Sequence, residues 1–417
     1  MTNKPASMVE LSQIISSRTQ YINDFLSREN LPQPSLGASG GTTSDFLPAG
    51  NKEMQQARLE LRDATNQLHL LTAGTDRALF ELSMLSQHDA NVLRVISTYN
   101  VPEHVPIDRA ISYAELSQRC GLDHGRLQRV LRYAMTIYIF QETEDGVAHT
   151  SLSRALASDD MKRDWMGHIM EDMFPISAHM VDGFQKWPGS DAPNHTGFHL
   201  MNKTDLGLFE WFETYHPSLV ARFGNAMKFY SSLHEQEVLD FDWNSLGPAI
   251  LVDVGGGYGH KAVSIARTAP QLRCVVQDLE GTIKSAPALP QDVCDRFTFQ
   301  VYDFFTPQPQ TTADVFFFAR IFHDWSDESC VKILANLVPS MKKGARLVIN
   351  DTILLPPNEG SIVDQRSRRS IDIHMMTALN AKERSLDEWK HLVDKGSDGL
   401  LTLEFASGSA FLSFIYL

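Results

Sequence analysis

The sequence has few cysteines and no long apolar run. Only four of its 417 residues are cysteines (Cys120, Cys274, Cys294 and Cys330), and no two of them form a CxxC pair. This is too sparse for a disulfide framework or a cysteine-based zinc site. No stretch approaches the roughly 18 to 20 apolar residues of a membrane span, and residues 1–14 lack the basic start and apolar core of a signal peptide. We therefore expect a soluble, cytoplasmic protein.

Positive charge is also in deficit. The chain has 37 Lys and Arg against 51 Asp and Glu, a formal net charge of −14. Nucleic acids and anionic membranes bind basic surfaces, so this balance argues against both as partners. A content of 43% hydrophobic residues is ample for large cores, and the length suggests two or three domains at roughly 150 residues each.

The N-terminal part reads as helices joined by a linker. Residues 5–30 have the apolar spacing of an amphipathic helix. Residues 31–50 are rich in Pro, Gly, Ser and Thr, which is typical of a linker. Residues 51–90 return to helical spacing, and their leucine stripe favours core or dimer packing.

Residues 111–150 predict a winged-helix motif. A helix leads to a turn near Gly121, a second helix spans about 125–135, and a hairpin pairs residues 139–142 with 147–149 across Asp145-Gly146. The second helix carries Arg126, Arg129 and Arg132, so DNA binding is one interpretation. The acidic balance and the enzyme-like second half favour a packing role instead. Residues 151–235 then read as helical and rich in aromatic residues and methionine.

From about residue 248 strands and helices alternate, which indicates an α/β domain with a largely parallel sheet. The expected strands are 249–254, 272–278, 297–303, 314–322 and 345–351, with helices at 259–268 and 328–342.

A glycine-rich run follows the first of these strands. Asp253 is followed by Gly255, Gly256, Gly257 and Gly259, and then by an amphipathic helix. Glycines at the carboxyl end of a first strand let the backbone approach a ligand closely.

The residues around this run bear on which cofactor binds there. The next strand ends in Gln277-Asp278-Leu279, which places a carboxylate where it can bind ribose hydroxyls. The G-x-G-x-x-G pattern of dinucleotide enzymes is not met, because His260 stands where its third glycine belongs. Asp253 would suit the cationic part of S-adenosylmethionine (SAM) better than a pyrophosphate, so the loop favours SAM over NAD.

Several further motifs carry a family resemblance. The third strand ends in Tyr302-Asp303-Phe304, the fourth leads into I-F-H-D-W-S-D at 321–327, and N-A-K-E-R-S follows at 380–385. With the glycine run and Q-D-L, in this order, the sequence resembles the plant- and fungal-type SAM-dependent O-methyltransferases. These include caffeate and flavonoid methyltransferases and the fungal polyketide enzymes of the sterigmatocystin O-methyltransferase kind. The winged-helix half resembles the dimerisation domain of that family.

The resemblance implies catalytic and substrate-binding roles. His323 matches the general base, flanked by Glu383 and Asp351, where plant members usually have Glu at the latter position. A phenol has a pKa near 10, so a positioned imidazole would take its proton as the oxygen attacks the sulfonium methyl. No metal is expected, since the charge of the cofactor already activates the methyl group. Asp324 and the pair Met375 and Met376 match substrate contacts.

The resemblance also implies the cofactor contacts. Gly255 and Gly257 would bind the methionine moiety, Asp278 with Leu279 the ribose, and Asp303 with Phe304 the adenine; Asp253 and Arg320 complete the expected set. Plant members often carry Lys four residues before the histidine, where this chain has Ala319 with Arg320 beside it. The C-terminal segment lacks the Pro-Pro that commonly precedes its Gly-Ser, and the tail of residues 1–50 resembles fungal members.

Together these observations predict an α/β Rossmann-like SAM-binding catalytic domain at 236–417 and a helical, winged-helix dimerisation domain at 51–235, preceded by a helix and linker at 1–50. We expect a homodimer that methylates an aromatic hydroxyl of a fungal polyketide or related secondary metabolite. Alternatives are a non-catalytic regulator that uses the winged helix, an NAD-dependent oxidoreductase, and a family variant that acts on nitrogen or catalyses a SAM-bound rearrangement.

Overall fold

The computed structural model of the chain describes residues 6–42, 46–48, 50–233, 238, 241–357, 359–407 and 410–417. The chain forms two compact units, and each draws on several stretches of sequence. Residues 1–175, 212–230 and 361–364 form the first unit, and residues 176–211, 231–360 and 365–417 form the second. The units are therefore interleaved along the chain, whereas the sequence predicts contiguous segments at 1–50, 51–235 and 236–417.

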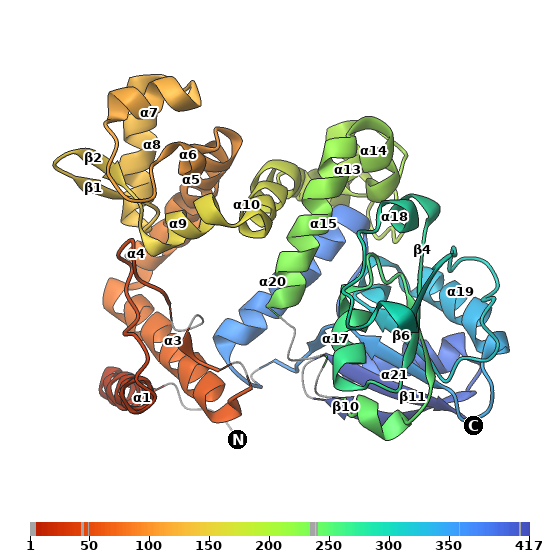
Figure 1. The fold of residues 1–417 in the computed structure, drawn as a ribbon. Coiled ribbons are helices and arrows are strands. Elements are labelled where there is room, and N and C mark those ends of the chain that lie inside the picture. Colours follow the sequence, from red (N-terminus) through yellow and green to blue (C-terminus); the bar gives the residue numbers. More distant parts are fainter. Residues whose placement is uncertain are drawn as a thin grey trace. The chain divides into compact units, whose positions relative to one another are not determined.

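The first unit begins with two long helices that pack on each other (Figure 1). Helix α1 spans Met8–Arg28 and begins with a capping box between Ser7 and Glu10. Helix α3 spans Lys52–Ala73, and buried apolar side chains of both helices form one cluster. The helix predicted at 5–30 is confirmed over Met8–Arg28. Residue 5 lies outside the described residues, as do 43–45 and 49 of the predicted linker.

Shorter helices lead from α3 to the winged-helix motif. They are α4 (Thr75–Phe80), a π-helix η1 (Glu81–Leu85), α5 (Ser86–Thr98) and α6 (Val101–His104).

The winged-helix motif is present. Helix α7 (Tyr113–Cys120) ends at Gly121 with φ +71°, and α8 (His124–Thr136) begins after Asp123, whose side chain accepts from the Arg126 N–H. Strands β1 (Gln141–Thr143) and β2 (Gly146–Ala148) form the wing.

The turn of the wing lies one residue earlier than predicted. Gly146 pairs with Thr143, so residues 144 and 145 form the turn. The reason is tertiary: Ile111 bridges to Val147, and a Cβ at Gly146 would lie 2.2 Å from the Ile111 carbonyl oxygen.

The following region is helical, as predicted, with residues 234 and 235 outside the described part. Its helices are α9 (Ser151–Ser158), α10 (Asp160–Gly167), the π-helix η2 (His168–Met173), α11 (Phe174–Ser177), α12 (Met180–Lys186), α13 (Gly197–Asn202), α14 (Leu208–Tyr215) and α15 (Pro217–Ser232).

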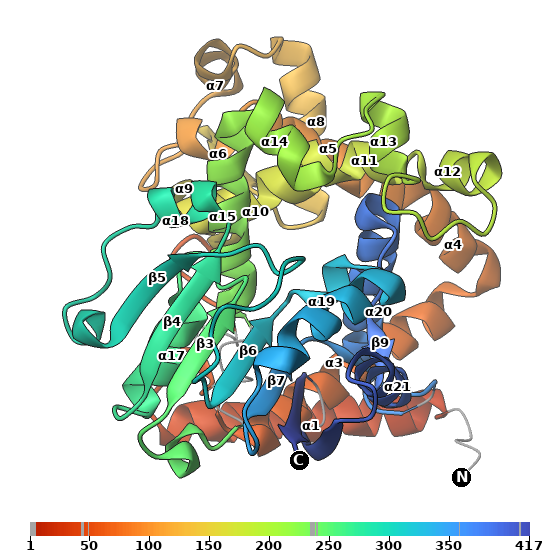
Figure 2. The same ribbon diagram turned by 90° about the vertical axis from the view of Figure 1, so that its right-hand side faces the viewer.

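The second unit contains a seven-stranded sheet in the order β10-β11-β7-β6-β3-β4-β5. Figure 2 shows five of these strands side by side, in the order β7, β6, β3, β4 and β5. All neighbours are parallel except at β11, which is antiparallel to both β7 and β10. The five strands expected between 249 and 351 are confirmed. The strands are β3 (Ile250–Val254), β4 (Arg273–Asp278), β5 (Phe297–Val301), β6 (Val315–Ala319), β7 (Arg346–Asn350), β10 (Leu401–Ser407) and β11 (Phe411–Tyr416).

Further helices and a small second sheet complete this unit. The helices are α17 (His260–Thr268), α18 (Glu280–Ser285), α19 (Asp327–Leu337), α20 (Ile362–Leu379) and α21 (Leu386–Gly396). The 3₁₀ turns are η3 (Trp243–Leu246), η4 (Cys294–Arg296), η5 (Phe322–Asp324) and η6 (Val338–Ser340), and the small parallel sheet pairs β8 (Ile353–Leu354) with β9 (Arg384–Ser385).

Both faces of the large sheet are buried, as its apolar strands predict. Phe316 and Phe318 of β6 lie in one core with residues of α19 and α21. Val315 and Phe317 lie in a second core with residues of α17. The alternation along each strand thus divides its side chains between two cores.

The C-terminal hairpin forms despite the missing Pro-Pro. Strand β10 pairs with β11 with a register shift between Leu403 and Phe405, and Phe411 of β11 pairs with Asn350 of β7. Residues 408 and 409 of this segment lie outside the described part. Across the described ranges, every helix is too short or too polar to cross a bilayer.

Candidate active site

The candidate catalytic residues follow two neighbouring parallel strands. Ala319, the last residue of β6, pairs with Asn350, the last residue of β7. His323 lies in η5, four residues past β6, and Asp351 directly follows β7. Ligands of open α/β sheets bind at the carboxyl ends of the strands, and these two residues lie at that edge.

Glu383 is held beside this edge by the small sheet. Ile353 of β8, two residues past Asp351, pairs with Arg384 of β9, so Glu383 comes next to the end of β7. The Glu383 backbone N–H donates to Asp372 Oδ1 at 2.9 Å. Its Oε1 lies 2.8 Å from Nδ1 of His323, and both side chains are buried.

This hydrogen bond defines the role of each imidazole nitrogen. A carboxylate can only accept a hydrogen bond, so Nδ1 of His323 carries a hydrogen and donates this bond to Glu383. Nε2 is then the nitrogen that can accept a proton from another molecule. The nearest carboxylate oxygen to it is Oδ1 of Asp324, at 3.5 Å, which is too long for a good hydrogen bond.

Three carboxylates surround the imidazole and change its acidity. Burial alone would lower the pKa of His323, but the negative charges of Glu383, Asp324 and Asp351 outweigh burial and raise it to about 9. Burial raises the pKa of Asp351 to about 7 and that of Asp324 to about 6; in both, the nearby His323 opposes the shift and Glu383 adds to it.

Some acidic oxygens of this cluster have no hydrogen-bond partner among the described residues. They are both carboxylate oxygens of Asp351 and Oε2 of Glu383, and all three are buried. Asp351 has no exposed surface. Buried polar groups are nearly always paired, so these oxygens make the strand edge a candidate ligand site.

The glycine loop and the tip of β4 form a second group of candidate residues. Asp278 at the end of β4 accepts from the N–H of Gly257 and from that of Leu279, each at 2.8 Å. Gly255 and Gly257 have φ values of +69° and +57°, which favour glycine. The carboxylate of Asp278 thus fixes the loop and is half-buried, which leaves it accessible to a ligand hydroxyl.

The glycine loop contacts the turn that carries the histidine. A Cβ at Gly255 would lie 2.5 Å from Ile321 Cδ1 and 3.8 Å from the Phe304 ring. Ile321 accepts from the Asp324 N–H and stands two residues before His323. The loop expected to hold the cofactor and the turn expected to hold the base are therefore in van der Waals contact.

Asp253 lies beneath this loop. A Cβ at Gly256 would lie 2.6 Å from its carboxyl group, and Asp253 is 1% exposed. Burial, aided by the charge of Asp278 and opposed by Lys261, raises the pKa of Asp253 to about 7. A cationic ligand at the loop would favour its ionised form.

The remaining expected cofactor contacts lie near the same edge. Asp303 is exposed and caps its own turn by accepting from the Phe305 N–H, while the Phe304 ring meets Trp325 edge-on. Leu279 is 52% exposed. Arg320 has φ +58° and donates to Thr352 Oγ1.

The two methionines expected to contact substrate lie in the C-terminal part of helix α20, which ends at Leu379. Met375 is buried and Met376 half-buried. Their carbonyl oxygens accept from the N–H groups of Ala381 and Asn380, in the turn that leads to Glu383.

Sequence reasoning missed several residues that support this geometry. Asp372 holds the backbone of Glu383, and Arg384 holds the turn of His323. Lys261, which is buried, donates to Asn350 at 2.7 Å. Their roles depend on backbone groups or on partners far along the chain, which no spacing reveals.

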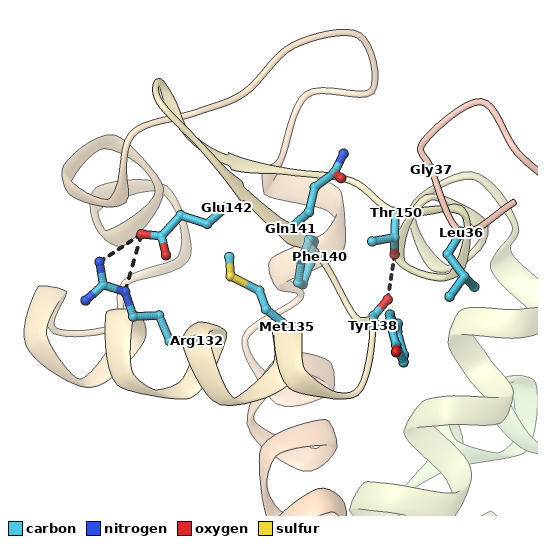
Figure 3. Close-up of a pocket in the computed structure, with 9 residues that line it drawn as sticks. All are labelled: Leu36, Gly37, Arg132, Met135, Tyr138, Phe140, Gln141, Glu142 and Thr150. Atoms are coloured by element: carbon cyan, nitrogen blue, oxygen red, sulfur yellow. Dashed lines mark hydrogen bonds and ion pairs between the residues drawn. The ribbon is translucent and has the colours of Figure 1, made fainter.

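A pocket of about 580 Å³ lies beside the wing in the first unit (Figure 3). Met135, Tyr138 and Phe140 contribute to its lining, together with Leu36 and Gly37 of the N-terminal linker. It contains none of the expected site residues, all of which belong to the second unit.

The sheet is buried on both faces, its last strand in the chain, β11, is antiparallel, and a glycine loop follows its first strand, β3. These features define a SAM-dependent methyltransferase fold. Residues 198–397 match the family model of the O-methyltransferase domain, and residues 78–159 match that of the O-methyltransferase dimerisation domain. The chain belongs to the O-methyltransferase family and is a SAM-dependent O-methyltransferase.

The relatives are fungal enzymes of similar length. O-methyltransferase pgmB of Aspergillus terreus is 35% identical, over 92% of this chain and 89% of that protein. A chlorophenol O-methyltransferase of Trichoderma longibrachiatum is 33% identical, over 92% of this chain and 83% of that protein.

Solved structures share the fold. A variant of LepI in complex with SAH and a substrate analogue matches with a TM-score of 0.72 and 26% identity, over 87% of this chain and 95% of that chain. OxaC matches with a TM-score of 0.79 and 23% identity, over 98% and 99% of the two chains.

Proposed function

We propose that the protein methylates an aromatic hydroxyl group and that His323 is the general base. One observation carries this proposal: the buried hydrogen bond of 2.8 Å between His323 Nδ1 and Glu383 Oε1. It orients the imidazole and leaves Nε2 to take a proton. A histidine held by a carboxylate is the arrangement by which a base is oriented and its protonated form stabilised.

The pKa of the proposed base suits a phenol substrate. The pKa of His323 is raised to about 9, and a phenol has a pKa near 10. The neutral form of this imidazole is therefore a strong enough base to accept a proton from a phenol, whereas an aliphatic alcohol is a far weaker acid. The name of the chlorophenol O-methyltransferase from Trichoderma gives one relative that acts on a phenol.

The cofactor site is proposed at the glycine loop. Gly255 and Gly257 would bind the methionine part, Asp278 with Leu279 the ribose, and Asp303 with Phe304 the adenine. Bound SAM supplies an electrophilic methyl group on a sulfonium. The half-buried carboxylate of Asp278 fits its hydroxyl groups, and the buried carboxylate of Asp253 fits its positive charge.

The surrounding carboxylates would assist the base. Asp351 and Glu383 would stabilise the imidazolium that forms when His323 takes the proton. Asp324 would contact substrate beside Nε2, and Met375 and Met376 would face a flat aromatic ring. We place the substrate among phenolic fungal polyketides and related secondary metabolites, on the strength of the fungal relatives.

Substitution of the base tests the proposal. We expect His323→Ala to lower kcat by about 10²–10⁴-fold while SAM affinity, measured by calorimetry, stays within about twofold. His391→Ala, an exposed histidine of α21, is the matched control.

The readout is mass spectrometry of a phenol panel with SAM. Transfer adds one methylene mass to the phenol, whereas an isomeric product without a mass gain would indicate a SAM-bound rearrangement. Retained turnover in His323→Ala, or a collapse of SAM affinity, would contradict the assignment of the base.

We also propose that the protein is a homodimer. The match to the dimerisation domain supports this, as does an apolar surface on consecutive helices of the first unit. Leu71 at the end of α3, Leu79 and Phe80 of α4, and Leu82 of η1 are each more than 40% exposed. Light scattering of Leu79→Glu/Leu82→Glu should give half the mass of the parent if these helices form the dimer interface.

A cytoplasmic location is the remaining part of the proposal. All four cysteines are free thiols in the structure, and free thiols persist in reducing compartments. Fractionation of the source cells would test it.

A further inference from the structure

Arg384 is a buried cation beside the proposed base and has no role in the proposal so far. Its side chain is 0% exposed. Its Nη1 donates to the carbonyl oxygens of Phe322 at 3.0 Å and Lys382 at 3.3 Å, and its Nη2 donates to that of Trp325 at 2.9 Å. Nε and Nη2 lie 2.9 and 2.8 Å from Asp327 Oδ1.

These acceptors bracket the two residues of the proposed dyad. Phe322 precedes His323 and Trp325 follows it by two residues, while Lys382 and Arg384 flank Glu383. One rigid guanidinium therefore ties the turn that carries the histidine to the turn that carries the carboxylate. The Trp389 ring packs against the guanidinium, with its centroid 5.2 Å from Cζ of Arg384.

A purely structural role would not require this residue. Burying a charge is costly, and an apolar side chain of similar volume often serves stability equally well or better. Among the described residues the arginine pairs with one acidic side chain, Asp327, which is half exposed and so screened by water. What an apolar residue cannot supply is the planar fork, whose donors reach several backbone carbonyls at fixed angles.

We propose that Arg384 is a positioning residue that sets the distance between His323 and Glu383. It holds both backbone segments at once, so the hydrogen bond of 2.8 Å between Nδ1 and Oε1 depends on it. This inference rests on the proposed function, because it presumes that the dyad acts as the base. Misplacement of a catalytic group by about 1 Å can cost about 10²-fold in rate.

The test compares Arg384→Lys with a matched substitution. Lysine keeps the charge but donates from a single atom, so it cannot hold both turns. The control is Arg346→Lys, since Arg346 also forms a two-donor ion pair, with Glu404, but begins β7 at the end remote from Asp351. Both variants are assayed with SAM and a phenol that the parent methylates.

We expect Arg384→Lys to lower kcat on the order of 100-fold, with SAM affinity by calorimetry within about twofold of the parent. The pH midpoint of kcat/KM should fall by about one unit, because Glu383 no longer raises the pKa of the base as strongly. In a Glu383→Gln background the same substitution should cost at most a fewfold, since the contact it protects is already lost. Arg346→Lys should match the parent.

Two results would overturn the inference: a kcat for Arg384→Lys within twofold of the parent, or an equal loss in the parent and Glu383→Gln backgrounds with an unmoved pH midpoint. If Arg384→Lys does not fold, Asp327→Asn replaces it, because Asp327 orients the guanidinium from a half-exposed site. It should lower kcat severalfold only when Glu383 is present, and an unchanged kcat would again refute the role. His323→Ala in the same assay separates the two claims, since activity that survives it refutes the base and not the position of Arg384.

Discussion

Glu383 Oε1 lies 2.8 Å from His323 Nδ1, and both side chains are buried where strands β6 and β7 end. This pairing gives the two imidazole nitrogens different tasks. One is occupied by the carboxylate, and the other can take a proton from a substrate. The predictions below follow from this pair and from the charges around it.

Glu383→Gln should lower kcat while leaving SAM affinity unchanged. A neutral amide can still hold the ring, but it no longer stabilises the imidazolium. We expect a loss of about 10²–10⁴-fold, comparable to the removal of a general base. Single-turnover rates with bound SAM measure it, and Glu388→Gln, an exposed carboxylate at the start of α21, is the control. Equal rates for the parent and Glu383→Gln would mean that the carboxylate has no catalytic part.

The rate should depend steeply on pH. A general base acts in its neutral form, and the pKa of His323 in the free enzyme is raised to about 9. Below that pH the imidazole is protonated, so kcat/KM should rise by about tenfold per pH unit and level off near pH 9. A profile that is flat from pH 6 to 9 would contradict this, provided that circular dichroism shows the protein folded throughout.

Asp351→Asn should stabilise the protein at alkaline pH. The pKa of Asp351 is raised from 3.8 to about 7, so between these values the folded chain binds a proton that the unfolded chain has lost. Stability therefore falls as the pH rises from about 4 to about 7 and stays at the lower level above 7, and the amide removes this cost. The gain at pH 8 is at most about 4 kcal/mol, less the cost of burying an unpartnered amide.

Urea unfolding at two pH values measures this effect. The advantage of Asp351→Asn should shrink as the pH falls below 7 and vanish at about pH 3, where the parent carboxyl is mostly protonated in both states. Activity should fall in the same variant, because a charge beside the imidazolium is lost. A variant less stable than the parent at pH 8 would contradict the prediction, because it would show that the surroundings stabilise the ionised carboxylate of Asp351.

Asp278→Asn should weaken SAM binding. Asp278 fixes the glycine loop through the N–H groups of Gly257 and Leu279, and an amide can accept only one of these bonds. A loss of about 2 kcal/mol, or about 30-fold in Kd, is expected for hydrogen bonds to a charged group. Titration calorimetry with SAH measures it. Glu280→Gln, two residues further on and exposed, should bind normally.

Gly146→Ala should unfold the wing. The glycine has φ +124° and a Cβ would lie 2.2 Å from the Ile111 carbonyl oxygen. We expect a loss of about 3 kcal/mol or more. Gly121→Ala is the matched control, because Gly121 also has positive φ but has open space around it; it should cost only about 1–2 kcal/mol. Equal losses of stability in the two variants would mean that the positive φ alone, and not the contact with Ile111, requires glycine at position 146.

The sequence predicts best where local chemistry and parallel-strand geometry act together. His323 and Asp351 stand just after strands, and parallel neighbours bring such positions to one edge of the sheet. The sequence predicts less well where a contact joins distant backbone groups. Gly146 shifts the turn of the wing because of Ile111, and Arg384 binds carbonyl oxygens, which every residue has. Neither relationship leaves a trace in spacing or composition.

The interleaving of the two units affects how the protein folds during synthesis and where it can be joined to a relative in a chimera. A ribosome that has synthesised only the first 175 residues has not yet supplied Arg222, which pairs with Glu171 and with the buried carboxylate of Asp172. The first unit also takes in residues 361–364, where the backbone N–H groups of Ile362 and Val363 donate to Asp63. Folding of the N-terminal unit should therefore finish only after nearly the whole chain has emerged. A chimera joined to a relative at one crossover point would split this unit between two parents.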